Sequence, residues 1–370
     1  MQTAVIVVMA LFLCIGALDK ALFDGKYGYG KEFEKGLNAM GPLTIMMVGM
    51  MCAAPSIGKY ASPALAPLFV SIGSDPSMTA GMLLGIDAGG LPLAKALACS
   101  PEALMLSGVA LSSTLSCVLT FSIPLSLSMA SPEARPAVAK GLAAAIIASP
   151  LSLVATGVVC GYDPILVLKL GFPAFAVAIF LALCLIFFRD ATVRLFILFG
   201  RVLISIFVIL LAISAIEHYF DFVIIPYTDP IEPQFTIIGE IGIMLAGAYP
   251  LVLFVKKTCT KPLEILAKAL GINADATLGM VVSAANPLPM YGMLNSMSNR
   301  GRVLCSAFSG PILCLLGDHL GFISAAWPEA MIPMLCGKLF AAFCALGLAI
   351  LFERISPVDI IAPCGKSLES

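Results

Sequence analysis

ALMLSGVALSSTLSCVLTFSIPLSLSMASP, residues 103–132, contains no charged side chain. A transmembrane helix needs about 20 predominantly apolar residues, and this stretch is longer than that. The rest of the chain has the same character, because 60% of its residues are hydrophobic and only 12% are charged. Soluble globular domains carry about 25% charged residues. The sequence therefore predicts a protein whose solvent is the lipid bilayer.

Similar uncharged stretches recur along the chain and predict an all-α polytopic membrane fold. They cover residues 2–18, 36–58, 141–162, 171–188, 202–216, 241–255, 276–299, 303–317 and 339–352. The first stretch has neither a basic start nor an A-x-A cleavage site, so we expect a retained helix rather than a signal peptide. The polar connectors are short, which leaves no room for a separate soluble domain.

Composition and motifs argue against several function classes. The net charge is −1 and the Lys and Arg residues are scattered, which argues against a nucleic-acid partner. The 12 cysteines show no C-x-x-C spacing, so no metal site is expected. The sequence contains no P-loop, no H-E-x-x-H motif and no G-x-S-x-G motif. We therefore expect no cofactor and no enzyme activity.

The two halves of the sequence resemble each other. A single ungapped shift of 198 positions places Gly41 on Gly239 and Gly49 on Gly247. Other pairs at this shift are Ile45 and Ile243, Met46 and Met244, Gly73 and Gly271, Thr79 and Thr277, Gly81 and Gly279, Met82 and Met280, and Lys140 and Lys338. We predict one membrane domain with repeats at about 1–160 and 192–353, a linking helix at 164–188 and a short tail at 354–370.

The basic residues predict the orientation, because cytoplasmic loops are enriched in Lys and Arg. They gather at 26–35, 135–140, 189–194, 256–261 and 300–302, whereas acidic connectors lie at 163, 221–232 and 329. These sides agree if the segments at 75–98 and 273–297 are re-entrant hairpins. The result is two inverted repeats with about nine full spans among about nine to eleven membrane segments. The N-terminus would then lie outside and the C-terminus in the cytoplasm.

Both predicted hairpins contain residues that interrupt a helix. The first reads GIDAGGLPLAK at 85–95, and the second reads SAANPLPMY at 283–291. Backbone groups freed by such breaks are tolerated in a membrane only where they are buried in protein or line a wet cavity. Matched broken segments in two halves are a pointer to a transporter's substrate site. The candidate residues there are Asp87, Gly89, Gly90, Ser283, Asn286 and Tyr291.

Charged and aromatic residues add further candidates. Asp87 is the leading one, because a carboxylate inside a membrane is costly unless it serves a cation, a proton or a partner. Its alternative role is a structural ion pair with Lys95. The adjacent Asp318 and His319 could relay a proton, or they could satisfy each other in helix packing. Tyr249 could offer its ring to an ammonium group, although aromatic residues in apolar helices more often only pack.

Four strings of the sequence resemble the bacterial ethanolamine permease family, EutH. They are GMLLGIDAGGLPLAKALA at 81–98, GAYP at 247–250, GMVVSAANPLPMYGM at 279–293 and LGDHLGF at 316–322. The likeness extends from Asp19 to about Leu351, and GAYP and GDHLGF are its most specific parts. The resemblance implies facilitated uptake of ethanolamine across the bacterial inner membrane.

A small cation that carries a hydroxyl group fits the candidate residues. We hypothesise that Asp87 pairs with the ammonium and that Asn286 or Ser283 binds the hydroxyl. Two alternatives stay open: a secondary transporter of another small solute, such as a nucleoside or an amino acid, and a non-transport membrane protein centred on Asp318 and His319. Because transporters of this size are often dimers, a homodimer is a further expectation.

Overall fold

The computed structural model describes residues 2–258 and 260–355, and every regular element in these residues is helical. Eight helices in this part of the chain are long and apolar enough to cross a membrane. The predicted all-α polytopic membrane fold is therefore confirmed. The predicted tail at 354–370 lies almost wholly outside the described residues.

The first half contains two long helices, a hairpin, a broken helix and a helical pair. The long helices are α1 (Gln2–Phe23) and α3 (Met40–Ser71), with α2 (Tyr29–Asn38) between them. The hairpin consists of α4 (Met78–Leu83), the π-helical turn η1 (Ile86–Gly90) and α5 (Leu91–Leu97). The broken helix consists of α6 (Pro101–Leu104), η2 (Met105–Leu111), α7 (Leu115–Cys117), η3 (Val118–Ser122) and α8 (Ile123–Met129). The pair is α9 (Arg135–Ala148) and α10 (Ser152–Cys160), joined by η4 (Ser149–Leu151).

The second half follows the linking helix α11 (Pro164–Phe187) and repeats most of this order. It begins with α12 (Arg189–Phe220), α13 (Ile231–Thr258) and α14 (Thr260–Leu270). Its hairpin consists of α15 (Ala274–Ser283), α16 (Leu288–Met293) and η5 (Leu294–Ser296). Its broken helix consists of α17 (Asn299–Ile312) and α18 (Asp318–Ala326), and η6 (Pro328–Ala330) and α19 (Met331–Ile355) end the described chain.

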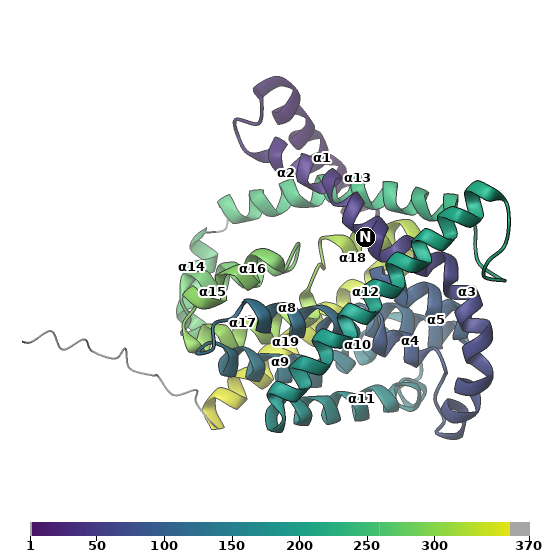
Figure 1. Cartoon of the computed structure of the whole chain (residues 1–370). Helices are drawn as coiled ribbons and strands as arrows, with labels where there is room; N and C mark the ends of the chain where they lie inside the picture. The colour runs from purple at the N-terminus through teal and green to yellow at the C-terminus, as the bar shows by residue number, and fades with distance from the viewer. Residues whose placement is uncertain (1, 259, 356–370) are drawn as a thin grey trace, which may run out of the picture.

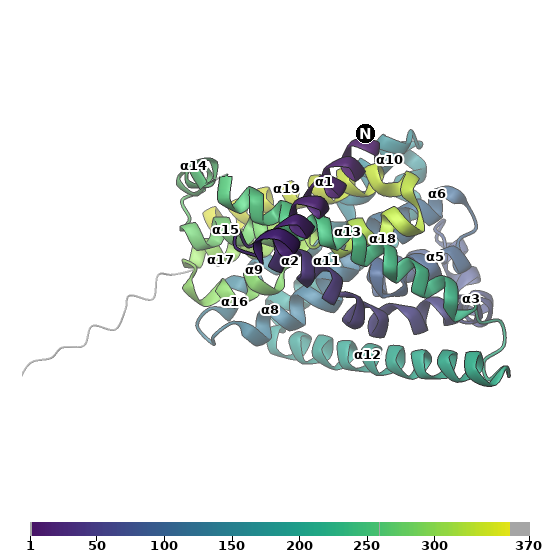
Figure 2. The same ribbon diagram turned by 90° about the horizontal axis from the view of Figure 1, so that it is seen from above.

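The helices form a body with long helices around it. In Figure 1, α13 runs along one side and α11 along the opposite side, with α9, α10, α17 and α19 between them. Figure 2 shows α12 along the outside of this body. Only 11% of an 18-residue apolar window of α12 is buried, compared with 83% of the corresponding window of Pro101–Met129. We infer that α12 faces lipid and that the broken helix is central.

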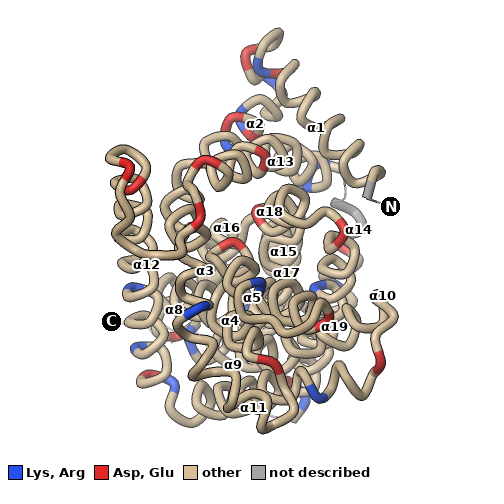
Figure 3. The backbone as a smooth tube through the Cα atoms, turned by 90° about the vertical axis from the view of Figure 1, so that its right-hand side faces the viewer, with Lys and Arg blue, Asp and Glu red and all other residues tan. Residues whose placement is uncertain are grey.

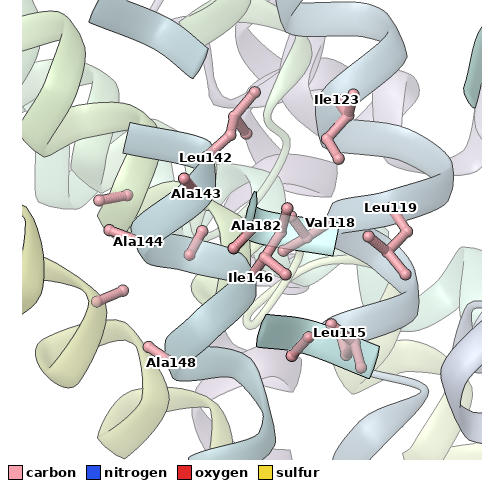
Figure 4. Packing of buried hydrophobic residues seen from close by; sticks show 14 of the residues in the cluster. Leu115, Val118, Leu119, Ile123, Leu142, Ala143, Ala144, Ile146, Ala148 and Ala182 are labelled. Atoms are coloured by element: carbon pink, nitrogen blue, oxygen red, sulfur yellow. The ribbon is translucent and has the colours of Figure 1, made fainter. Parts of the chain in front are cut away.

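The core of the body is packed around this broken helix. Figure 4 shows its side chains facing those of α9, with Ala182 of α11 beside them. The facing residues are Leu115, Val118, Leu119, Ile123, Leu142 and Ile146. α9 also approaches α17 so closely that a Cβ on Gly141 would collide with the backbone oxygen of Val303. Small residues allow such close packing, which replaces the missing hydrophobic drive between helices in lipid.

The first helix of each half packs against the other half. A Cβ added to Gly49 of α3 would collide with the α12 backbone at Phe207, and one added to Gly247 of α13 would collide with the α1 backbone at Met9. The shift of 198 positions relates Gly49 to Gly247 and Met9 to Phe207. Equivalent residues therefore make both contacts, α1 on α13 and α12 on α3.

Each hairpin is closed at its base by one polar side chain. Asp75, just before α4, accepts a hydrogen bond from the backbone N–H of Cys99, just after α5, at 3.0 Å. Asn273 stands at the equivalent position of the second half and accepts one from the N–H of Ser298 at 3.2 Å. Both segments therefore return to the place where they began.

The break in each hairpin touches the break in the helix that follows. The N–H of Ile86 donates to the Ser112 carbonyl at 2.9 Å, and the N–H of Leu316 donates to the Ala284 carbonyl at 2.7 Å. Ser112 lies between η2 and α7, and Leu316 lies between α17 and α18. These bonds satisfy backbone groups that lipid could not.

Candidate functional site

A cavity of about 440 Å³ lies where the broken segments of the two halves meet. The lining residues from the two hairpins are Gly85, Asp87, Ala88, Asn286, Pro287 and Leu288. Tyr249 of α13 and Asp318 and His319 of α18 add polar groups to the wall, as do Lys35, Asn38 and Thr120, and apolar residues such as Met46 and Phe121 form much of the rest. In Figure 3 most charged positions lie around the rim of the molecule, and few lie near the centre beside α18. A largely apolar cavity with a few convergent polar groups is typical of a small-molecule site.

Asp87 is carried by η1, where the backbone leaves the helical conformation. Gly89 in this turn has a φ of 89°, a conformation that glycine adopts at little cost. A Cβ at Gly89 would collide with Met50 of α3. The turn leaves the Asp87 side chain 23% exposed, with its Oδ1 3.8 Å from Nε2 of His319. Asp87 of the first half therefore meets a residue of the second.

Asp318 begins α18, and the glycine before it permits this position. A Cβ on Gly317 would collide with the carbonyl oxygen of Ala285, so glycine lets the second hairpin approach. Oδ1 of Asp318 is buried and has no hydrogen-bond partner among the described residues. Its Oδ2 has the thiol of Cys314, a weak donor, at 3.8 Å. Burying an unsatisfied carboxylate oxygen is costly, so Asp318 is a candidate ligand for a cation in this cavity.

His319 connects Asp87 to a buried lysine. Lys338 of α19 is 0% exposed, and its Nζ donates hydrogen bonds to the carbonyl of Ser113 and, at 2.9 Å, to Nδ1 of His319. An ammonium group has only donors, so we assign the proton of the neutral imidazole to Nε2. This N–H faces Oδ1 of Asp87 and the sulfur of Cys117, which lies 3.5 Å away.

Asp87, Cys117 and His319 also form a group of potential metal ligands, with ligand atoms within 4.8 Å of one another. A metal would require an unprotonated Nε2 and a thiolate. The ammonium of Lys338 instead keeps the proton on Nε2, and the Cys117 thiol donates to the Ser112 carbonyl at 3.1 Å. The nitrogen and sulfur of the group are therefore engaged in hydrogen bonds, with Asp87 at 3.8 Å, an arrangement that does not fit a metal ion.

Tyr249 and Asn286 add an aromatic ring and an amide to the cavity wall. Tyr249 is nearly buried, at 6% exposure. Oδ1 of Asn286 accepts a hydrogen bond from the N–H of Leu288 at 2.9 Å, which stabilises the turn into α16. The same amide carries N–H donors, so it can both bind a solute and hold the turn.

The cavity brings together some of the residues predicted from the sequence and leaves others outside. Those that line it are Asp87, Tyr249, Asn286, Asp318 and His319. The remaining four do not line it. Gly89 and Gly90 belong to η1. The Ser283 hydroxyl donates to the Met280 carbonyl at 2.8 Å, and the Tyr291 hydroxyl donates to the Ser122 hydroxyl at 3.0 Å. Lys95 is exposed, and no ion pair joins it to Asp87 in the described part of the chain.

Sequence reasoning did not identify Lys338 as part of the site. This lysine directly precedes the uncharged stretch 339–352, as a lysine at a helix end would. In the structure it lies inside α19, with uncharged residues on both sides from Met331 to Phe352. That flanking pattern is the signal that could have identified it, because a lysine within a membrane segment is a functional candidate by default. Cys117 and Ser113 carry no comparable signal.

Comparison with known proteins extends these observations. The family described as ethanolamine utilisation protein EutH matches residues 1–352. A relative from Listeria monocytogenes, named "Probable ethanolamine permease EutH", is 36% identical over 94% of this chain and 92% of its own. A Salmonella typhimurium protein of the same name is 35% identical over 93% of each chain. The Bacillus subtilis protein YxeR is 36% identical over 91% of this chain and 90% of its own.

No solved structure matches the chain. The family match and the sequence identities nevertheless extend over nearly the whole length, including both hairpins and the residues around the cavity. The chain therefore belongs to the EutH family of ethanolamine utilisation proteins.

Proposed function

We propose that the chain carries protonated ethanolamine across the bacterial inner membrane by alternating access, and that the cavity between the hairpins is its binding site. The relatives named as probable ethanolamine permeases support this substrate. The observation that carries the proposal concerns Asp318, a residue that lines the cavity. Its buried Oδ1 has no hydrogen-bond partner among the described residues. A carboxylate in the interior of a membrane protein is costly unless it pairs with a cation.

The formal charges of the site suit a monovalent cation. Asp87 and Asp318 are taken as carboxylates, Lys338 as an ammonium and His319 as a neutral imidazole that accepts from it. Among these four residues one negative charge is left without a counterpart. Lys35, which also lines the cavity, is paired with Glu32 at 3.4 Å. A protonated amine supplies one positive charge, and it crosses a lipid core poorly without a carrier because charge is costly there.

The polar groups can be assigned to the two ends of ethanolamine. Its ammonium lies against Asp318 and Asp87, next to the ring of Tyr249, and its hydroxyl lies on the amide of Asn286. Ser283 is less suited to the hydroxyl, because its own hydroxyl is bonded to the Met280 carbonyl and the residue is fully buried. A water molecule takes up about 30 Å³ of liquid, so a cavity of about 440 Å³ holds a solute of four heavy atoms with solvent.

The repeated architecture supports alternating access. The cavity is lined by both hairpins, and each hairpin is held by the broken helix of its own half. Inverted repeats with broken helices at the binding site commonly move against each other to open the site to alternate sides. We propose that the two halves of this chain are such repeats.

Uptake by purified protein in liposomes tests the proposed function. Radiolabelled ethanolamine is expected to enter in a saturable way, at a pH at which the amine is protonated. Unlabelled ethanolamine should compete fully, whereas a nucleoside or an amino acid should not. Folded protein without saturable entry would rule out the proposal, and competition by amino acids alone would favour a transporter of another solute.

A further inference from the structure

A lysine lies within the helical body, where a charge is expensive. Lys338 is 0% exposed and stands between apolar turns of α19. Its neighbour Gly337 lets α10 approach closely, because a Cβ there would meet the hydroxyl of Thr156. A buried ammonium costs several kcal/mol unless it is paired and hydrogen-bonded, so its partners should show its role.

Both partners of Lys338 are groups that can bind a cation. One is the carbonyl of Ser113, at the break between η2 and α7, and the other is Nδ1 of His319. In many secondary transporters, carbonyl groups of unwound helices bind the coupling sodium ion or proton. In this chain the lysine ammonium already holds such a carbonyl.

The equivalent lysine of the first half has a different environment. Lys140, which the shift of 198 positions relates to Lys338, forms an ion pair with Glu353 at 2.6 Å, and its side chain is 19% exposed. No carboxylate in the described residues lies within ion-pair distance of Lys338. Its charge instead acts through His319, whose Nε2–H faces Asp87.

We infer that the ammonium of Lys338 serves the transport site as a permanent cation, supplied by the chain itself. It keeps the proton of His319 on Nε2, directed at Asp87, and it takes the position at a broken helix in which other transporters bind an inorganic cation. This role rests on the proposed transport of ethanolamine through the cavity. Two results follow: wild-type uptake needs no inorganic cation, and removal of the ammonium leaves a position that sodium can fill.

The experiment measures uptake of labelled ethanolamine into liposomes in sodium, potassium or N-methylglucamine salts of equal ionic strength. We expect wild-type uptake to be the same in all three. Uptake by Lys338→Ala in N-methylglucamine should fall about tenfold or more, as for loss of a charged hydrogen bond. Added sodium should restore part of it in a saturable way. Lys140→Ala is the matched control, and its uptake should show no dependence on the salt.

The outcomes separate this inference from the proposed function. Wild-type protein that takes up ethanolamine only with sodium would overturn the inference and leave the proposed function intact. Folded Lys338→Ala with wild-type uptake, or with equally slow uptake in every salt, would also overturn it. If Lys338→Ala elutes as an aggregate, the comparison of salts with the wild-type protein decides. Absence of saturable wild-type uptake in every salt would refute the proposed function itself.

Discussion

The two carboxylates of the cavity have unequal surroundings. Asp87 faces the Nε2–H of His319, although at 3.8 Å the contact is long. Oδ1 of Asp318 has no hydrogen-bond partner among the described residues. A buried carboxylate oxygen without a partner gains most from a bound ammonium, because a charged hydrogen bond contributes about 1.5–3 kcal/mol. Asp318 should therefore contribute at least as much to binding as Asp87.

Replacing Asp318 by Asn should weaken ethanolamine binding by about tenfold to a hundredfold, because the charge is lost and the shape is kept. The concentration at half-maximal uptake in liposomes measures this change. Asp190→Asn, which alters an exposed residue paired with Arg189, should match the wild type. An unchanged half-maximal concentration for Asp318→Asn would contradict the assignment of the ammonium to this residue.

At the residue scale, the sequence predicts candidate site residues where a polar or charged side chain interrupts an apolar stretch. This reasoning predicts Asp87, Asn286 and the Asp318-His319 pair, and in the structure all of them line the same cavity. The role of Lys338 could not be predicted in the same way, because one of its partners is a backbone carbonyl 225 positions away in the chain. No sequence pattern marks a carbonyl, so this contact emerges only from the fold.

Helix breaks were predictable at the element scale only where glycine and proline cause them. The first hairpin break contains glycines and a proline and the second contains two prolines, but the break between η2 and α7 falls at Ser112-Ser113-Thr114. There the Thr114 hydroxyl donates to the Ala110 carbonyl at 2.7 Å, and the Ser116 hydroxyl donates to the Ser112 carbonyl at 2.8 Å. Such side-chain bonds compete with the helix ladder. The uncharged stretch 103–132 is thus predicted as a span without its interruption. The break between α17 and α18 is different, because it contains Gly317 and follows Pro311.

Close helix crossings give a prediction with an internal control. Gly49→Ala should destabilise the protein by about 1–3 kcal/mol, because the added methyl group collides with the α12 backbone. Gly41→Ala in the same helix should be neutral or slightly stabilising, since nothing lies within 4 Å of its Cβ position. Thermal unfolding in detergent compares the two variants. Equal melting temperatures would show that α3 and α12 are not packed as described.

The clamp at the base of the first hairpin gives a second prediction at this scale. Asp75 also accepts from the N–H of Ser77 at 2.9 Å, so Asp75→Ala removes the acceptor of two backbone donors. We expect a loss of about 1–3 kcal/mol in stability, the cost of leaving such donors unsatisfied. Faster amide hydrogen exchange at Ser77 and Cys99 would show that the clamp has opened.

The matching variant in the second half tests whether the two clamps are equivalent. Asn273→Ala should speed exchange at Ser298 in the same manner. Unchanged exchange in either variant would mean that the hairpin is held by its packing alone.

At the scale of the whole molecule, the repeat in the sequence recurs as a repeat of contacts. Asp19 accepts a hydrogen bond from the N–H of Tyr27 at 3.0 Å, and Glu217 accepts one from the N–H of Ile225 at 2.7 Å. Both members of each pair are related by the shift of 198 positions. The glycine crossings obey the same shift. In the hairpin clamps the shift relates the acceptors Asp75 and Asn273, and the donor Ser298 lies one residue after the equivalent of Cys99. A repeat that preserves contacts as well as residues indicates two halves of common architecture.

The number of crossings then predicts the orientation. We count α1, α3, the broken helix at 101–129 and the α9–α10 pair as four crossings, while the hairpin returns to its own side. An even number brings the chain back to the side of the N-terminus, and α11 carries it across. This count predicts that the second half starts on the opposite side from the first, in which case the repeats are inverted.

Reporter fusions test this topology. With basic loops inside, alkaline phosphatase fused after Gly161 should be active outside, and green fluorescent protein fused after Arg189 should be fluorescent inside. The fusion that decides on the hairpin follows Ser131, because it lies beyond the first hairpin and the broken helix. It should report the cytoplasm if the hairpin is re-entrant and the outside if the hairpin crosses. An external result at Ser131 would contradict the re-entrant topology, and with it the inverted relation on which the proposed alternating access depends.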